Sequence, residues 1–532
     1  MPVNFELLDA KFSAKLNESI LRWWRIDILV VTDTIVSFGP EHDPRNLNES
    51  YFGMSHLIGV LESVGSVTKA HRSVDPLGAP GVVSGFRFDA HDLSVYDQIW
   101  FIGYESGNSL SAAEQDAIAR FMNSGGGVFA TGDHAALGSA LAGSLPRVRS
   151  MRRWSPPPPA LGATRVDTTM PDHQGRTVFE NQSDDIPQHL LLKWYPWNSS
   201  WLYRQLYPHP LLCSPSGPIT EFPDHMHEGE VIEPTVLDAV MTAGGQTFDE
   251  YPRDPAGHRV TPEIVAWGWS GGHSDPAVMS DVHTGDTVPA NRRWTGTVGA
   301  YDGKRAGVGR VVVDATWHHF FDINLIGDNA ANRASVTDPR KAVWSKGFTG
   351  SPDGQRVLGL VDQYFRNIVR WLSPGVGLVH FGALATELAM TTQIVEVLHD
   401  ERVTALEVGR HAWDLAVLRY PPCMIIELNR AVLDSIPRLR PVPFGPWDWP
   451  YPGPDDGPPR PPVPPVELAQ AALGAAILAV HELGPEGVLS DDATGRLAEV
   501  GLRGVRDHLA HQLDLAREAA DHLARAIGLF EG

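Results

Sequence analysis

A strand–helix–strand pattern in the first third of the chain constrains the fold most. Residues 96–106 (YDQIWFIGYES) and 128–134 (VFATGDH) contain short apolar runs that predict buried strands. Between them, residues 110–127 predict a helix that begins with a capping box of Ser111 and Glu114 and ends in three glycines. Strands joined in this way pair in parallel through a right-handed crossover. We therefore expect an α/β fold with a mostly parallel sheet flanked by helices.

Other segments extend this α/β pattern on both sides. Apolar runs predict strands at residues 25–33, 263–270 and 309–317. Apolar stripes predict helices at residues 49–65 and 354–374. We assign residues 25–374 to one α/β domain that follows an N-terminal arm, residues 1–24. Residues 145–262 are rich in proline and tryptophan and less regular. We expect them to form an insertion over the sheet rather than a separate domain.

The composition of the chain changes after residue 374. Residues 375–440 predict mainly helix, and residues 441–465 form a proline-rich linker that favours an extended conformation. Apolar residues then recur at three- and four-residue steps through residues 466–532, which predicts two amphipathic helices broken near residues 484–487 (GPEG). This helical hairpin is either an interface for a homo-oligomer or a hairpin packed on its own chain.

Composition excludes several classes of partner. The 532-residue chain carries 64 acidic and 43 basic side chains, a formal net charge of −21, which argues against binding to nucleic acid or to an anionic membrane. We expect a small-molecule substrate instead. Two cysteines, Cys213 and Cys423, are too few for a disulfide framework or a zinc–thiolate cluster. We find no signal peptide or long apolar run, so we expect a cytoplasmic protein.

Polar residues gather where the predicted strands end. In open parallel sheets, ligands bind beyond the carboxyl ends of the strands. The residues in this position are Asp33, Glu105, Asp133, His134, His318, His319 and Asp322. We expect Asp33 and Glu105 to line a pocket there. The turn from Gly132 to His134 has the shape of a nucleophile elbow, with backbone N–H groups exposed at the start of a helix.

The stretch EFPDHMHEGE, residues 221–230, concentrates metal-type ligands in a polar loop. An H-x-H pair such as His225 and His227 places both imidazoles on one side of an extended segment, a donor arrangement used for Zn²⁺, Mn²⁺ or Fe²⁺. We expect this loop to fold over the carboxyl edge of the sheet, where His318, His319 and Asp322 would supply further ligands. The ion would activate water, and Glu228 or Asp133, beside His134, would act as the general base. Each histidine taken alone is more often a hydrogen-bonded structural residue.

The order of these motifs is similar to that of the class I glutamine-amidotransferase-like superfamily, and closest to its ThuA-type (trehalose utilisation) proteins. The resemblance covers residues 25–140 and 300–372 and rests on the GGG–strand–G-x-H turn and the late GRV strand end. It implies an amidotransferase/flavodoxin-like fold. Those amidotransferases need a cysteine at the elbow to form a glutamyl thioester, whereas this chain has Thr131 to His134 there. Cysteine-dependent glutamine amidotransfer is therefore not expected.

Two functions remain open. The first is a metal-assisted hydrolase, or a related enzyme, acting on a small polar substrate, with a carbohydrate derivative suggested by the resemblance alone. The alternative is a non-catalytic amidotransferase-like scaffold that oligomerises through residues 466–532. The missing cysteine favours the scaffold, whereas the density of histidines and carboxylates in the loops favours the enzyme. We favour the enzyme.

Overall fold

The computed structural model divides into two compact units. The α/β unit comprises residues 26–193 and 211–374, and the helical unit comprises residues 1–25, 194–210 and 375–532. The residues that the structure describes are 26–46, 50–132, 136–154, 188–198, 204–214, 216–222, 230–254, 257–270, 293–316, 318–327, 346–373, 384–389, 392–398, 403–419, 425, 465–488, 496, 499–501, 503–508, 510, 511, 514 and 518.

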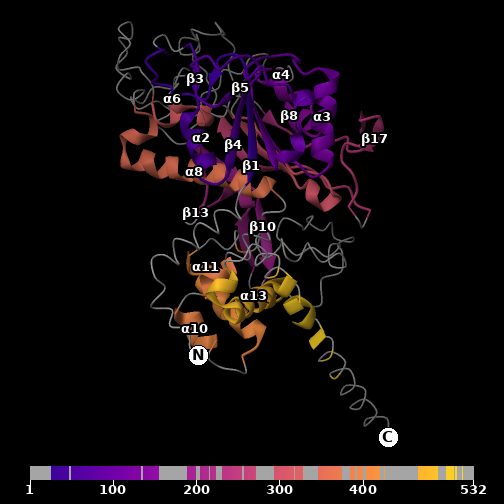
Figure 1. Ribbon diagram of the computed structural model, residues 1–532, viewed down its shortest axis with the longest axis vertical. Helices are drawn as coiled ribbons and strands as arrows, with labels where there is room; N and C mark the ends of the chain where they lie inside the picture. The colour runs from indigo at the N-terminus through magenta and orange to yellow at the C-terminus, as the bar shows by residue number, and fades with distance from the viewer. Residues whose placement is uncertain are drawn as a thin grey trace. The chain divides into compact units, whose positions relative to one another are not determined.

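A ten-stranded sheet forms the centre of the α/β unit (Figure 1). Six neighbouring strands are parallel, in the order β5 (Val82–Ser84), β4 (Ser66–His71), β1 (Asp27–Thr32), β6 (Gln98–Ile102), β7 (Gly127–Thr131) and β20 (Val311–Asp314). Four antiparallel strands continue from β20, in the order β19 (Arg293–Tyr301), β18 (Glu263–Ser270), β9 (Gln188–Leu192) and β14 (Glu221–Phe222). The expected mostly parallel α/β sheet is therefore confirmed, and it carries an antiparallel extension.

Helices cover both faces of the parallel strands. On one face, α2 (Ser55–Glu62), which connects β1 to β4, packs beside α8 (Pro352–Leu372). The helix α3 (Ala112–Asn123) connects β6 to β7 and packs on the other face. This alternation follows from the strand order, because the chain moves away from β1 in one direction through β4 and in the opposite direction through β6. Right-handed crossovers then place the connecting helices on opposite faces.

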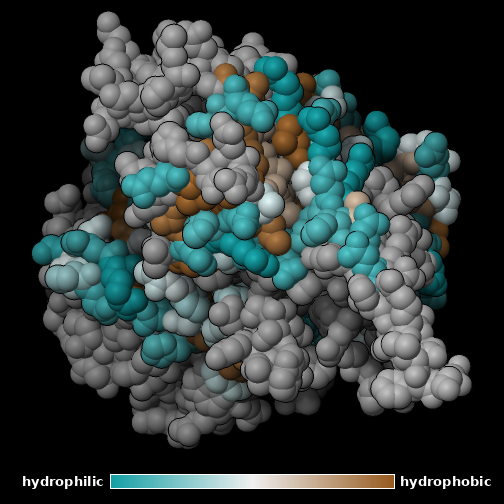
Figure 2. Space-filling view, turned by 90° about the horizontal axis from the view of Figure 1, so that it is seen from below, coloured by the Kyte–Doolittle hydropathy of each residue, from teal (hydrophilic) through white to brown (hydrophobic). Residues whose placement is uncertain are grey.

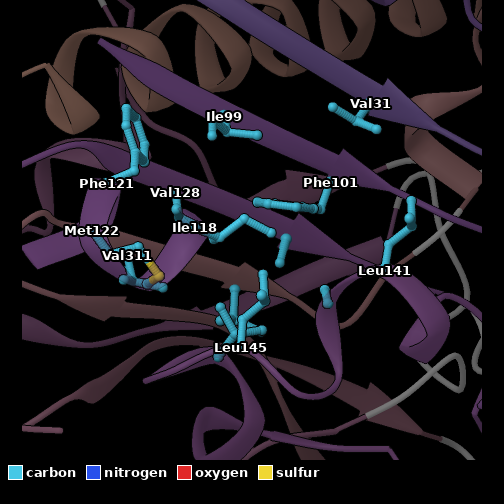
Figure 3. Packing of buried hydrophobic residues seen from close by; sticks show 14 of the residues in the cluster. Val31, Ile99, Phe101, Ile118, Phe121, Met122, Val128, Leu141, Leu145 and Val311 are labelled. Carbon is cyan, nitrogen blue, oxygen red and sulfur yellow. The ribbon is translucent and has the colours of Figure 1, made fainter. Parts of the chain in front are cut away.

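A large apolar core lies between α3 and the sheet (Figure 3). Alternate residues of four adjacent strands point to this face, and Ile118, Phe121 and Met122 of α3 pack against them. The strand residues are Leu29 and Val31, Ile99 and Phe101, Val128 and Ala130, and Val311 and Val313. All eight are fully buried. Burying an aliphatic or aromatic side chain stabilises a fold by about 1.5–3 kcal/mol, so this layer is a large part of what holds the unit together.

The first turn of α3 has the capping box that the sequence predicts. The Ser111 side chain accepts a hydrogen bond from the Glu114 N–H at 3.3 Å, and the Glu114 carboxylate accepts one from the Ser111 N–H at 3.0 Å. Glu114 is buried and also pairs with Arg72, which follows β4. The cap therefore ties the start of α3 to the neighbouring strand end.

The insertion after residue 145 differs from the expectation that it lies over the sheet. Two of its strands, β9 and β14, join the sheet and lengthen it beyond β18. Pairing of this kind satisfies the backbone hydrogen bonds that β18 would otherwise leave open at an edge. Its other strands in the α/β unit form two-stranded sheets, which are β8 (Arg152–Arg153) with β15 (Glu230–Val231), β12 (Cys213–Ser214) with β13 (Gly217–Pro218), and β16 (Val240–Ala243) with β17 (Gln246–Asp249).

Short elements complete the α/β unit. The helices are α4 (Ser139–Ala142), α5 (Val148–Met151) and α6 (Asp322–Leu325), and β2 (Val36–Ser37) pairs with β3 (Phe52–Gly53). The 3-10 helices are η2 (Phe88–Ala90), η3 (Leu93–Val95), η5 (Pro210–Leu212), η6 (Gly303–Ala306), η7 (His318–Phe320) and η9 (Gly347–Gly350).

On the face of the molecule shown in Figure 2, hydrophilic residues cover much of the coloured surface, with apolar patches between them.

The helical unit has a separate apolar core. Its helices are α10 (Thr392–Leu398), α11 (Ala405–Arg419) and α13 (Pro465–Val488), and it also contains the hairpin β10 (Trp194–Asn198) and β11 (Arg204–Pro208). Gly409 and Gly474 allow α11 and α13 to touch along their backbones. Helix α13 ends at Val488, one residue beyond the segment 484–487 near which the sequence predicted a break. Nothing in the part of the chain that the structure describes is a helix both long and apolar enough to cross a bilayer.

Later helical residues return along α13. Gly504 lies against Ala471 and Ala475, and the His508 ring nitrogen Nε2 lies 3.7 Å from the Glu467 carboxylate. The contacts run in opposite directions along the two segments, so residues 503–508 are antiparallel to α13. Apolar side chains of α13, including Leu468 and Leu473, are buried within this unit.

Candidate functional site

The candidate site lies at the carboxyl ends of β1 and β6. The order of the parallel strands reverses between these two strands, and their connecting helices leave toward opposite faces of the sheet. Such a reversal opens a crevice in which doubly wound α/β proteins bind their ligands. Asp33 and Thr34 follow β1 directly, and Tyr104 and Glu105 follow β6.

Asp33 is the buried carboxylate at this point. Its side chain is 4% exposed. The oxygen Oδ1 accepts hydrogen bonds from the backbone N–H groups of Tyr104, at 2.7 Å, and Glu105, at 3.3 Å. The other oxygen, Oδ2, is buried and has no hydrogen-bond partner among the described residues. One carboxylate oxygen is therefore held by the end of β6, while the second accepts no hydrogen bond from any residue that the structure describes.

Burial raises the pKa of Asp33 from 3.8 to about 6. The hydrogen bonds from Tyr104 and Glu105 oppose this increase in pKa, the Glu105 charge adds to it, and Arg72 lowers it. A carboxyl group that exchanges its proton near neutral pH is suited to general acid–base catalysis, and such shifts concentrate at functional sites.

Thr34 joins the two strand ends. Its hydroxyl donates a hydrogen bond of 2.8 Å to the Glu105 carboxylate. Its φ of 48° lies in the left-handed region, which is rare for a β-branched residue and costs on the order of 1–3 kcal/mol. The strain persists because both neighbouring strands hold this turn, and it places the Thr34 hydroxyl on Glu105.

The turn after β7 packs closely against the same point. Its Gly138 has a φ of 87°, and a Cβ atom on this residue would lie 2.7 Å from the Gly103 carbonyl oxygen and 2.8 Å from the Gly132 Cα. The Gly138 N–H donates a hydrogen bond of 2.9 Å to the Glu105 carbonyl oxygen. Gly132 directly follows β7, so the start of the expected elbow lies at the carboxyl end of a strand, and Arg152 donates to its carbonyl oxygen.

His71, which sequence reasoning missed, ends β4 beside β1. It is fully buried, its Nδ1 accepts a hydrogen bond of 3.0 Å from the Ser73 N–H, and burial lowers its pKa. The nearby Asp75 carboxylate opposes this decrease in pKa and accepts hydrogen bonds from the Ser37 hydroxyl and the Phe38 N–H. The signal was the segment SVTKAH, which places a histidine at the end of a strand, although its alternation is weak.

His319 belongs to a different, fully buried network at the end of β20. Its Nε2 lies 3.2 Å from the Asp314 carboxylate, and its Nδ1 lies 2.7 Å from the Thr316 hydroxyl. The Tyr364 hydroxyl of α8 donates a hydrogen bond of 2.7 Å to Asp314, and burial together with Asp314 raises the pKa of Tyr364. Each of these four side chains is at most 1% exposed. The network therefore ties α8 and η7 to β20.

Asp322 lies at a third place, the N-terminus of α2. Its carboxylate accepts hydrogen bonds from the Ser55 N–H at 3.1 Å, the Ser55 hydroxyl at 2.6 Å, the His56 N–H at 2.9 Å and the Glu41 N–H at 3.2 Å. A carboxylate here satisfies open N–H groups of the helix and interacts favourably with its dipole. The arrangement explains the burial of Asp322 without a metal ion.

The predicted site residues are therefore only partly brought together. Asp33 and Glu105 meet, whereas His319 and Asp322 belong to separate networks, and His318 begins η7. Within the described ranges, no group of three or more His, Cys, Asp or Glu side chains is arranged to hold a metal ion. The remaining predicted residues lie outside the described residues, and they are Asp133, His134, His225, His227 and Glu228.

No protein-family model, curated protein or solved structure matches this chain. The resemblance to amidotransferase-like proteins therefore stays a prediction.

We expect Gly138→Ala to lower the free energy of unfolding by about 2–4 kcal/mol, because the new methyl group adds a clash to the strain of a positive φ. Gly107→Ala is the matched control, since Gly107 has a φ of 97° and open space around its Cβ position. The control should lose only the conformational part, about 1 kcal/mol. Urea unfolding measures both variants, and equal losses would contradict the close packing of this turn.

We expect Asp33→Asn to stabilise the protein at neutral pH. The folded protein keeps a proton on Asp33 up to about pH 6, whereas the unfolded chain loses it near the ordinary pKa of 3.8, so the free energy of unfolding falls as the pH rises through this window. Asparagine keeps an acceptor for the Tyr104 N–H and removes that loss. The gain should grow from near zero at pH 4 to at most about 3 kcal/mol at pH 7.5. A gain that does not change with pH would contradict the raised pKa.

Proposed function

We propose that the protein is a hydrolase-type enzyme that acts on a small polar substrate at the carboxyl edge of its sheet. The observation that carries the proposal is Asp33, a buried carboxyl group with a pKa of about 6 at the reversal of the strand order, one oxygen of which has no hydrogen-bond partner among the described residues. Burying such a group costs free energy that ordinary packing would not require. Buried groups that destabilise the fold in this way occur mainly at functional sites.

Asp33 would transfer the proton in the reaction. Its ionised form would accept a proton from water or a substrate hydroxyl, and its neutral form would return the proton to the leaving group. The Tyr104 and Glu105 N–H groups hold Oδ1 and orient the carboxyl group, so Oδ2 is the reactive oxygen. Glu105, oriented by Thr34, would contact a polar group of the substrate.

The metal-assisted form of the proposal adds His225, His227 and His318 as ligands. Glu228, or Asp133 beside His134 in the elbow, would act as the general base toward the metal-bound water. It is supported by the chemistry of the H-x-H-E pattern and by the position of Gly132 at the end of β7. The amidotransferase-like ancestry is part of the same proposal. The scaffold alternative draws less support, because apolar residues of α13 such as Leu468 and Ile477 are buried against their own chain.

We expect Asp33→Asn to lower kcat by about 10²- to 10⁴-fold, the usual contribution of a general acid–base. A substrate is first found by assaying the purified chain on p-nitrophenyl esters, phosphates and glycosides. Asp97→Asn is the matched control, since Asp97 precedes β6 and lies at the opposite end of that strand. Unchanged kcat in Asp33→Asn, or an equal loss in the control, would refute the role of Asp33.

We expect any divalent metal that co-purifies with the tag-free protein to be lost in the double variant His225→Ala, His227→Ala. Plasma emission spectroscopy measures the metal, and circular dichroism checks that the variant folds. His189→Ala with His258→Ala is the matched control, because these ring-bearing side chains are 73% and 76% exposed. Metal that stays bound in the His225→Ala, His227→Ala variant and is lost from the His189→Ala, His258→Ala control would refute the assignment of the H-x-H ligands.

A further inference from the structure

A cleft of about 660 Å³ lies on the antiparallel half of the sheet, away from Asp33. Its floor is the face of β18 and β19 that carries Trp267 and Trp294, and its wall is the chain from Glu230 to Val236. The strands β7 and β20 separate β19 from β6. The cleft is thus a second site, and it does not depend on the function proposed above.

Strand pairing places the two tryptophans on the same face. Trp267 pairs with Gly296, and Trp294 lies two residues before Gly296 on β19. Alternate residues of a strand share a face, and directly paired residues of neighbouring strands do too. Gly296 has no side chain, so β15 crosses directly above it and its Val231 carbonyl approaches the sheet. The crossing leaves the two indoles as a floor beside a raised wall.

The floor includes a solvent-exposed indole. Trp294 is 45% exposed. An indole exposed within a concave surface, rather than on a convex one, is typical of a site where a flat apolar face is bound. A cleft of this volume lies in the range of small-ligand sites, about 300–1,000 Å³.

Charged residues of the wall restrict the ligand. Arg153 and Glu230 form an ion pair of 3.3 Å, with side chains 31% and 17% exposed, and Glu233 accepts a hydrogen bond of 3.2 Å from the Ile264 N–H. The charges of Arg153 and Glu230 offset each other within their ion pair, and the further carboxylate of Glu233 disfavours an anionic ligand. A neutral ligand with hydroxyl groups can bind the ion pair without separating the two charges. It needs donors and acceptors in neighbouring positions to match the ion pair, and an apolar face to match the indoles.

We propose that this cleft binds a saccharide, with one pyranose ring stacked on Trp294 and adjacent hydroxyls hydrogen-bonded to Arg153 and Glu230. A pyranose is neutral, carries C–H groups on one face and presents vicinal hydroxyls at its rim. The C–H face matches the indole floor, and the vicinal hydroxyls match the ion pair of Arg153 and Glu230. Trp267 extends the floor, and the volume accommodates a disaccharide.

The test uses cellobiose and maltose as probes, titrated into the full-length protein while tryptophan fluorescence and heat are recorded. At least one disaccharide should bind with a dissociation constant of about 0.1–10 mM. Trp294→Ala should weaken binding at least about 10-fold, which corresponds to about 1.4 kcal/mol, and Trp294→Phe should restore part of it. Arg153→Gln should weaken binding without changing the fold.

Trp194→Ala is the matched control, since Trp194 is a similarly exposed tryptophan, at 43%, that does not line the cleft. It should bind like the unmodified protein. Asp33→Asn should also keep full binding, so loss of activity at the first site and loss of saccharide binding are measured separately. Three outcomes would each overturn the proposal, namely no binding up to about 50 mM of either disaccharide, preferential binding of choline or acetate, or unchanged binding in Trp294→Ala.

Discussion

The parallel pairing of β1 with β4 on one side and β6 on the other is the constraint on which the rest of the α/β unit depends. It sets the direction of each later crossover, and therefore the face on which α2 and α3 pack. Eight alternate residues of four strands are then buried against α3. The same pairing leaves the carboxyl ends of β1 and β6 as the place where loops diverge and polar groups meet.

Polar groups at these strand ends have different roles, although they look alike in the sequence. Asp314 and Asp322 accept enough hydrogen bonds to account for their burial, and each links two distant segments. Asp33 is buried to a similar extent, but its Oδ2 has no hydrogen-bond partner in the described part of the chain. Burial removes water from this carboxyl group and so favours its protonated form, which is why its pKa rises. The number of hydrogen bonds that a buried carboxylate accepts, rather than its burial alone, separates a candidate functional residue from a structural one.

The antiparallel extension adds a second kind of surface. The strands of a parallel sheet are covered by helices on both faces, whereas β18 and β19 carry their tryptophans beside a short two-stranded sheet, β8 with β15. The contact of Val231 with Gly296 holds that small sheet at one end and leaves a cleft at the other. The insertion thus supplies two strands of the sheet extension, β9 and β14, and the wall of the proposed saccharide site.

The sequence by itself determined the features whose causes are local. The apolar runs of β1, β6 and β7, the capping box of α3 and the stripe of α8 depend on neighbouring residues, and they predicted these elements and the mostly parallel sheet. They also placed Asp33 and Glu105 at strand ends. Only the tertiary structure decided which polar residues meet, because hydrogen bonds such as that from Ser55 to Asp322 span 267 positions. The tertiary structure also decided that His319 joins a buried hydrogen-bond network and that β9 and β14 pair with the sheet. Short strands are stabilised by the strands they pair with rather than by their own residues.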